Sequence, residues 1–292
     1  MSRWLVTGAG GMLGRDLTAL IDGTGEDCLK LGRTSLDITD PAAVRDALAG
    51  YRPDVVVNCA AWTAVDDAEA AEDAAFAVNG SAVAGIAAVC RELGISLVQV
   101  STDYVFDGMA RTPYAEDHLP APRTAYGRTK LAGEHAVLTT LPGTGYVVRT
   151  AWLYGAHGHS FVGTMLGRAQ AGVPSTVVND QRGQPTWTVD VAAQIHALLE
   201  AGAPPGIYHA TSSGEATWYD LAREVYRLAD ADPSLVQPVG TGAYPRPAPR
   251  PAYSVLGHDA WHRAGLKPID DWLDSLGRAL PAIMATESEL TR

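Results

Sequence analysis

The stretch LVTGAGGMLG, residues 5–14, decides the fold. It joins a short apolar run at 3–8 to a helical pattern over 10–22, in which leucines recur on one face. Glycine lets the chain turn tightly at such a junction and lets its backbone approach a pyrophosphate, which the N–H groups of the following helix bind. A merely flexible turn is the alternative. The strand before it and the helix after it favour a dinucleotide-binding site.

Strand and helix patterns continue to alternate through the first half of the chain. Apolar runs rich in β-branched residues predict further strands, and proline, glycine or a capping aspartate marks many of the boundaries between elements. Such alternation predicts a Rossmann-type α/β fold, a doubly wound parallel sheet covered by helices on both faces. The predicted strands are 3–8, 28–31, 53–61, 95–102 and 145–150, and a long helical region covers about 66–93.

The second half contains more glycine and proline, with helices predicted around 188–200 and 217–230. We therefore divide the chain into residues 1–150, a dinucleotide-binding domain, and residues 151–292, a smaller and loop-rich, mainly substrate-binding portion. Some elements of the second part are expected to return to the first.

Composition limits the partners of the protein. The formal net charge is −11, which argues against nucleic acid or an anionic membrane as a partner. Three scattered cysteines suit neither a disulfide framework nor a zinc site. The N-terminus does not read as a signal peptide, and we find no apolar run long enough to cross a bilayer. We expect a cytoplasmic protein.

The residues after the second predicted strand bear on the choice of cofactor. An NAD enzyme usually carries an acidic residue there for the ribose 2′-hydroxyl, whereas this chain has Arg33 and Thr34. A guanidinium fork suits a 2′-phosphate. We therefore predict NADPH, with NADH as the alternative; a solvated loop charge is the other interpretation of Arg33.

Hydroxyl groups and a Tyr-x-x-x-Lys pattern follow the fourth predicted strand. The strand ends in VSTD, and ligands bind at the carboxyl ends of parallel strands. Tyr126 and Lys130 are four residues apart and share one face of the next helix. Reduction of a ketone by hydride needs a proton at the developing alkoxide, which Tyr126 can deliver if the Lys130 ammonium lowers its pKa. Thr102 can orient the carbonyl, so we predict Thr102, Tyr126 and Lys130 as the catalytic set.

Several stretches in fixed order carry a more specific resemblance. TGAGGMLG (7–14), VSTDYVFDG (100–108), YGRTKLAGE (126–134) and PRPAPRPAYSVL (245–256) span most of the chain. Together they resemble the dTDP-4-dehydrorhamnose reductase family of extended short-chain dehydrogenase/reductases. The glycine spacing of that group is G-x-x-G-x-x-G, which Gly8, Gly11 and Gly14 match.

The resemblance implies reduction of the 4-keto group of a dTDP-4-dehydro-6-deoxyhexose by NADPH, with dTDP-4-dehydro-L-rhamnose as the first candidate. It also implies a homodimer. The implied roles are Gly8, Gly11, Met12 and Leu13 at the pyrophosphate, Asp37 and Ile38 at the adenine, Ala61, Trp62 and Thr63 along the cofactor, Thr102, Asp103 and Trp152 at the sugar, and Arg250 at the substrate phosphates.

Some positions depart from the family pattern. Pro249 stands where many members carry a second arginine, and Trp62 replaces a common histidine, which leaves open a 4-ketoreductase of an antibiotic deoxysugar or dihydrostreptose pathway. A non-catalytic NADP-binding regulatory subunit is an alternative of another class. The acidic residues linked to a bridging Mg²⁺ are only partly matched, so no metal is expected. We interpret the acidic run 66–73 as a solvated helix start and Trp218 as a packing residue.

Overall fold

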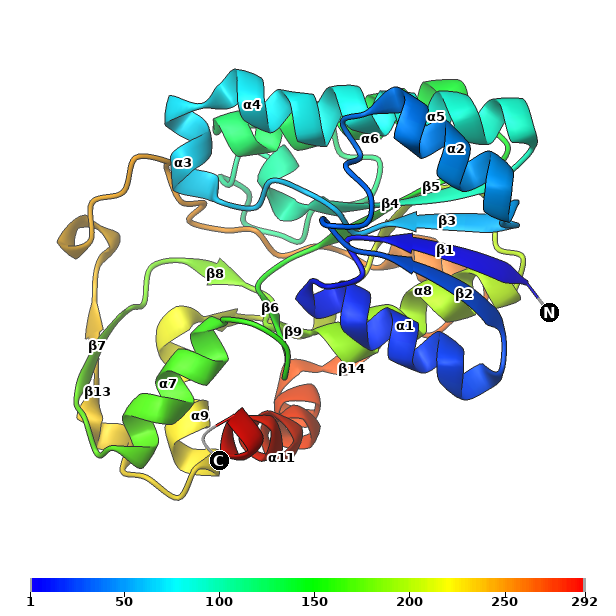
Figure 1. Ribbon diagram of the computed structural model, residues 1–292. Helices are drawn as coiled ribbons and strands as arrows, with labels where there is room; N and C mark the ends of the chain where they lie inside the picture. The colour runs from blue at the N-terminus through cyan, green and yellow to red at the C-terminus, as the bar shows by residue number, and fades with distance from the viewer. Residues whose placement is uncertain (1, 291–292) are drawn as a thin grey trace.

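A computed structural model describes residues 2–290, with side chains described for residues 2–286 (Figure 1). Its centre is a six-stranded sheet in which all neighbouring strands are parallel. This confirms the Rossmann-type doubly wound fold. The strand order is β2 (Asp27–Leu31), β1 (Arg3–Thr7), β3 (Val55–Asn58), β4 (Ser96–Thr102), β5 (Gly145–Thr150) and β10 (Gly206–His209).

Helices cover both faces of the sheet, and both faces are apolar. In β3, for example, Val56 packs into the core on one face and Val57 into the core on the other. Alternate side chains point to opposite faces of a strand, so a strand buried on both sides reads as a continuous apolar run. Figure 1 shows α1 (Met12–Thr24) and α8 (Thr188–Glu200) below the sheet and α2 (Pro41–Tyr51), α5 (Ala82–Leu93) and α6 (Ala125–Thr140) above it.

The helical region predicted at 66–93 is interrupted. It contains α3 (Val65–Ala70), α4 (Glu72–Phe76), a π-helical turn (Ala77–Ser81) and α5. By length and composition, the helical stretch Glu72–Leu93 could cross a membrane, because an 18-residue window within it has a mean hydropathy of 1.5. This corrects the expectation that no run is long enough. Half of that window is buried within the fold, and core helices of globular proteins pass the same test.

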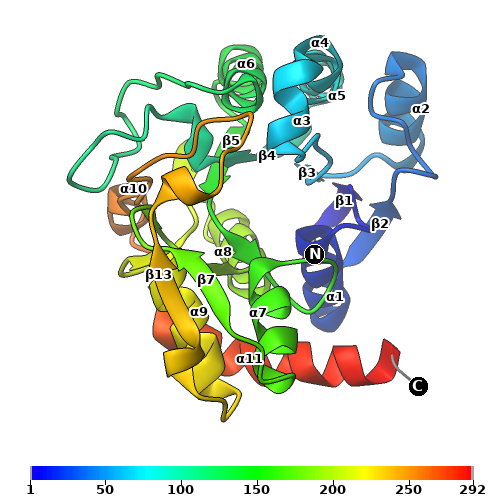
Figure 2. The ribbon, with the colours of Figure 1, turned by 90° about the vertical axis from the view of Figure 1, so that its left-hand side faces the viewer.

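A third cluster of buried residues lies outside the sheet, among helices and strands that Figure 2 shows. It is built from α7 (Phe161–Gln170), α9 (Trp218–Leu228), α11 (Trp272–Leu290) and the parallel pair β7 (Ser175–Val178) and β13 (Val236–Val239). The remaining strands form short two-stranded sheets: β6 (Leu153–Tyr154) with β9 (Thr186–Trp187), β8 (Arg182–Gly183) with β12 (Ala216–Thr217), and β11 (Ser212–Ser213) with β14 (Ile269–Asp271). Helix α10 (Asp259–Arg263) precedes β14.

The strand order fixes where a ligand fits. The chain leaves β1 for β2 on one side and then returns to β3 on the other side of β1. Loops therefore diverge at the carboxyl ends of β1 and β3, which is where open α/β sheets bind ligands.

Candidate active site

A cleft of about 1770 Å³ opens at the carboxyl ends of the strands. It extends from the glycine-rich turn, past the ends of β3, β4 and β5, to the part of the chain built around β7 and α7. All the site residues expected from the sequence line this one cleft. They are Gly8, Gly11, Met12, Leu13, Arg33, Asp37, Ile38, Ala61, Trp62, Thr63, Thr102, Asp103, Tyr126, Lys130, Trp152 and Arg250.

The glycine-rich turn has no room for side chains. Gly8 has φ +64°, and a Cβ on it would lie 2.6 Å from the backbone nitrogen of Ala60. A Cβ on Gly14 would lie 2.3 Å from the Gly8 carbonyl oxygen, because the first turn of α1 rests on the loop. Two of the three motif glycines are therefore required by backbone contacts of the fold itself.

The start of α1 fits an anion. Gly11 is its N-cap and supplies no side-chain cap, and no acidic residue stands in the first turn. Within residues 2–290, no hydrogen bond caps the N–H groups of Met12 and Leu13 from outside the helix. Free N–H groups and the positive end of the helix dipole suit the pyrophosphate of a dinucleotide.

The residues expected at the adenosine part of the cofactor site differ in burial. Ile38 is buried, whereas Arg33 and Asp37 are exposed in the loop after β2. Hydrogen bonds from Thr39 and, to a smaller extent, the charge of Arg33 lower the pKa of the Asp37 carboxyl. The backbone of Trp62 is held at both its N–H and its carbonyl by the amide of Asn79, which lies in the π-helical turn. Asn79 was not expected from the sequence, since nothing local links it to a residue 17 positions earlier.

Thr102, Tyr126 and Lys130 converge from β4 and α6. Thr124 caps α6 by accepting from the Gly127 N–H at 3.0 Å. The side chains of Thr102 and Tyr126 both line the cleft, and Thr102 Oγ1 donates to Asp103 Oδ1 at 3.0 Å. Lys130 is buried, and its Nζ donates to the Val100 carbonyl at 2.6 Å. The cleft therefore places a phenol, a hydroxyl and an ammonium around one space.

The expected lowering of the Tyr126 pKa is not found. Burial raises the pKa of Tyr126 to about 12, against the opposing contact with Thr102. The Lys130 ammonium, whose own pKa burial lowers to about 8, donates to the Val100 backbone. The sequence argument considered only the charge of the lysine and not the desolvation of the phenol.

This lowered value leads to a pH prediction. The Lys130 side chain is charged below about pH 8 and loses its charge as the pH rises through that value, since its pKa in the fold is depressed from 10.5. We expect kcat/KM for NADPH, which reports ionisations of the free enzyme, to fall over the same window. Lys130→Arg should remove this fall because arginine stays charged, whereas a flat wild-type profile would contradict the assignment.

A buried ion pair lies close to Lys130. Glu134, one turn further along α6, accepts from Arg149 Nε at 2.9 Å, from Arg149 Nη2 at 2.7 Å and from Ser101 Oγ at 2.5 Å. The side chains of Glu134 and Arg149 are each 1% exposed, and the guanidinium lies over the Phe106 ring. The sequence prediction missed this pair; the position of Glu134 four residues after Lys130 was the available signal.

The part of the cleft assigned to the sugar combines a carboxyl group with stacked indoles. Asp103 is 3% exposed, and burial raises its pKa to about 6. Trp152 has φ +48° and stacks on Trp218 with ring centroids 3.6 Å apart. A Cβ on Gly183 would lie 2.5 Å from the Trp152 ring, so the stack depends on that glycine. Trp218 also lines the cleft, which corrects its assignment to packing alone.

The acidic run at 66–73 is not simply a solvated helix start. Asp66 does lie in the first turn of α3, but its carboxylate accepts hydrogen bonds from Nη1 and Nη2 of Arg250, at 2.9 and 2.8 Å. This contact joins segments 184 residues apart.

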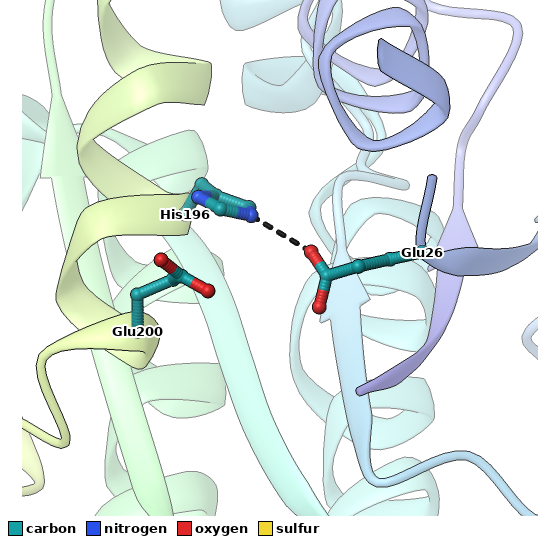
Figure 3. Close-up of side chains that lie close together, drawn as sticks. All are labelled: Glu26, His196 and Glu200. Carbon is teal, nitrogen blue, oxygen red and sulfur yellow. Dashed lines mark hydrogen bonds and ion pairs between the residues drawn. The ribbon is translucent and has the colours of Figure 1, made fainter. Parts of the chain in front are cut away.

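A second group of ionisable side chains, shown in Figure 3, is not among the residues that line the cleft. Glu26, His196 and Glu200 place potential metal-ligand atoms within 4.8 Å of one another. However, Glu26 already accepts from the Ser2 N–H at 3.1 Å, from Thr24 Oγ1 at 3.1 Å and from His196 Nε2 at 2.9 Å. These contacts outweigh burial and lower the pKa of Glu26 to about 2. We therefore interpret the Glu26–His196 hydrogen bond as a structural contact between the edge of the sheet and α8.

The fold and cleft define a class of protein. A Rossmann sheet, a glycine-rich turn after its first strand, and a Tyr-x-x-x-Lys helix facing a strand that ends in Ser-Thr are the features of a short-chain dehydrogenase/reductase. Residues 2–284 match the family described as RmlD substrate binding domain. The chain belongs to this family, the dTDP-4-dehydrorhamnose reductases, as the sequence resemblance predicted.

Three relatives illustrate the family. The chain is 57% identical to a probable dTDP-4,6-dihydroxy-2-methyloxan-3-one 4-ketoreductase of Streptomyces antibioticus, over 99% of this chain and 98% of that protein. It is 55% identical to a dTDP-4-dehydrorhamnose reductase of Streptomyces griseus, over 96% and 94%. A crystal structure of dTDP-4-dehydrorhamnose reductase from Bacillus anthracis in complex with NADP is 33% identical, with a TM-score of 0.91 over 96% of this chain and 99% of that one. The chain is therefore an oxidoreductase, as expected, and the NADP in the Bacillus anthracis structure is the cofactor that the sequence predicted.

Proposed function

We propose that the protein reduces the 4-keto group of a dTDP-4-dehydro-6-deoxyhexose to an alcohol. The observation that carries the proposal is the single cleft, which joins an uncapped helix N-terminus after a glycine-rich turn to the Thr102, Tyr126 and Lys130 side chains. When bound, NADPH would supply the hydride. Relatives named as reductases of dTDP-linked ketosugars support the substrate class.

The residues of this chain would perform the remaining steps. Tyr126 Oη would give its proton to the carbonyl oxygen as that oxygen becomes an alkoxide, so the product alcohol gains one hydride and one proton. Thr102 Oγ1 would hydrogen-bond the same oxygen and fix its position. The Lys130 ammonium would donate hydrogen bonds to ribose hydroxyls of the cofactor.

We propose dTDP-4-dehydro-L-rhamnose as the first candidate substrate, with dTDP-L-rhamnose as product. The ketosugar of an antibiotic pathway is the second, and the 57% identical 4-ketoreductase of Streptomyces antibioticus favours it. NADPH oxidation by purified protein with each ketosugar, followed by NMR of the product stereochemistry, separates the two.

No turnover with any dTDP-4-keto-6-deoxyhexose, together with an intact biological role in Tyr126→Phe, would favour the NADP-binding regulatory subunit. A cytoplasmic homodimer without nucleic-acid or membrane partners stays a prediction.

The cofactor preference can be tested at Arg33. Its guanidinium lies exposed at the adenosine end of the cleft, where it would pair with a 2′-phosphate. We expect Arg33→Ala to lower the NADPH:NADH ratio of kcat/KM by about tenfold, the size of one charge-assisted contact. Arg91→Ala, an exposed arginine on α5, is the control. An unchanged ratio in Arg33→Ala would show that another residue selects the cofactor.

A further inference from the structure

Two arginines and one aspartate meet where the C-terminal loop passes α3 (Figure 1). The loop, residues 244–251, contributes Arg246 and Arg250, which both line the cleft. Asp66 anchors the loop at three points, because it accepts from the Ala248 N–H as well as from two nitrogens of Arg250. Although burial opposes it, the contact with Arg250 holds the pKa of Asp66 below its ordinary value, so the anchor is a carboxylate at neutral pH.

The hydrogen bonds of Arg250 determine which of its donors remain free. A guanidinium has five N–H donors. Nη1 donates to Asp66 Oδ1 and to the Ala248 carbonyl, and Nη2 donates once, to Asp66 Oδ2. Within the described part of the chain, the Nε–H and the second hydrogen of Nη2 therefore have no partner. These two hydrogens lie on one edge of the planar group and form a fork that matches two oxygens of a phosphate.

Arg246 adds a second cation at the same place. Its Nη1 lies 3.9 Å from Asp66 Oδ2, the oxygen that Arg250 Nη2 contacts at 2.8 Å. The side chain of Arg246 is 59% exposed, so it is free to turn toward a ligand in the cleft. Two guanidiniums share one carboxylate here, so these three groups together carry one positive charge.

We propose that Asp66 is a positioning residue that presents the free edge of Arg250 to a diphosphate, and that Arg246 binds the second phosphate group. The ligand class is a nucleoside diphosphate or its sugar ester, so the inference rests on the proposed function and deepens it. Arg246 then supplies the second arginine that Pro249 does not provide. The Asp66 carboxylate is not displaced when the ligand binds, because it uses the neighbouring Nη1/Nη2 edge of the guanidinium and a different hydrogen of Nη2.

Titration with dTDP and dTMP tests this directly, since the two ligands differ by one phosphate group. Wild type should bind dTDP more tightly than dTMP, and Arg250→Ala or Arg246→Ala should remove most of that preference. Asp66→Asn keeps an oxygen for the Ala248 N–H but loses the charge that orients Arg250. It should weaken dTDP binding by about tenfold, and raise KM for the ketosugar with kcat changed by less than about twofold.

The controls separate positioning from a general loss of structure. Asp73→Asn and Arg91→Ala, both exposed on helices of the same layer, should bind dTDP like wild type. The Kd for NADPH should be unchanged in Asp66→Asn, which shows that the fold and the cofactor end of the cleft are intact. In an Arg250→Ala background, Asp66→Asn should have no further effect on dTDP binding, because it acts through Arg250.

Different results overturn different statements. If wild type binds neither dTDP nor dTMP, the proposed substrate class is wrong. If wild type prefers dTDP and Asp66→Asn binds it equally or more tightly, Asp66 does not position Arg250 and this inference fails while the proposed function stands. Equal losses for dTDP and dTMP in Arg246→Ala would likewise exclude Arg246 as the ligand of the second phosphate group.

Discussion

Replacement of Tyr126 by phenylalanine is expected to lower kcat for ketosugar reduction by about 10³-fold, the usual contribution of a positioned general acid. The phenol lines the cleft together with Thr102 and lies in the first turn of α6, so its hydroxyl can donate a proton to a ketone oxygen bound there. Phenylalanine keeps the ring and removes only the donor. The measurement is the steady-state rate of NADPH oxidation at saturating ketosugar.

The Kd for NADPH should stay within about threefold of wild type in this variant, since an unbound cofactor would also abolish turnover. Tyr146→Phe is the matched control. Its hydroxyl is also buried and donates to the Ala203 carbonyl at 2.9 Å, but it lies outside the cleft. Its loss should affect stability and leave kcat unchanged. Turnover by Tyr126→Phe at more than about a tenth of the wild-type rate would assign the proton to another group.

Replacement of Glu134 by glutamine is expected to destabilise the fold by about 3–5 kcal/mol, because it leaves the Arg149 guanidinium buried without a countercharge. Both side chains are 1% exposed, and Glu134 also accepts from Ser101. The free energy of unfolding in urea measures the effect. Glu134 also raises the pKa of Lys130, so the alkaline fall of kcat/KM for NADPH should move to lower pH in this variant.

Glu92→Gln is the control for burial. Glu92 forms the same kind of two-bonded pair with Arg45, at 2.6 and 2.8 Å, but both side chains are about half exposed. Its loss should destabilise the fold much less than the loss of Glu134 does, because water solvates the arginine that remains. If the two substitutions cost the same, the Glu134–Arg149 pair does not contribute through its burial.

Much of the fold could be predicted from the sequence because its signals are local. The strand predicted at 145–150 and the helix predicted at 188–200 have those bounds in the structure. Helix α1 begins at Met12 and not at 10, since Gly10 and Gly11 belong to the turn. The π-helical turn at Ala77–Ser81 was not predicted, because apolar periodicity does not distinguish one inserted residue within a long helical run.

The residues of the candidate site likewise fall into those with a local sequence signal and those without one. Its residues at strand ends and in short motifs, such as Thr102 and Tyr126, could be proposed from spacing alone, and the structure brings them into one cleft. Asp66, Asn79 and Trp218 were missed or misjudged, since each acts through a partner remote in the chain. The desolvation that raises the pKa of Tyr126 also depends on that packing.

The sequence by itself determined five of the six strands of the sheet, the glycine-rich turn and the residue types around the cleft, whereas β10 was not predicted. Periodicity and backbone freedom are properties of neighbouring residues, so they can be read along the chain. Only the tertiary structure decided how the charges pair: Asp66 with Arg250, and Glu134 with Arg149. The physical reason is that the strength and partner of a charge depend on distance and burial, which the folded packing sets and no local pattern contains.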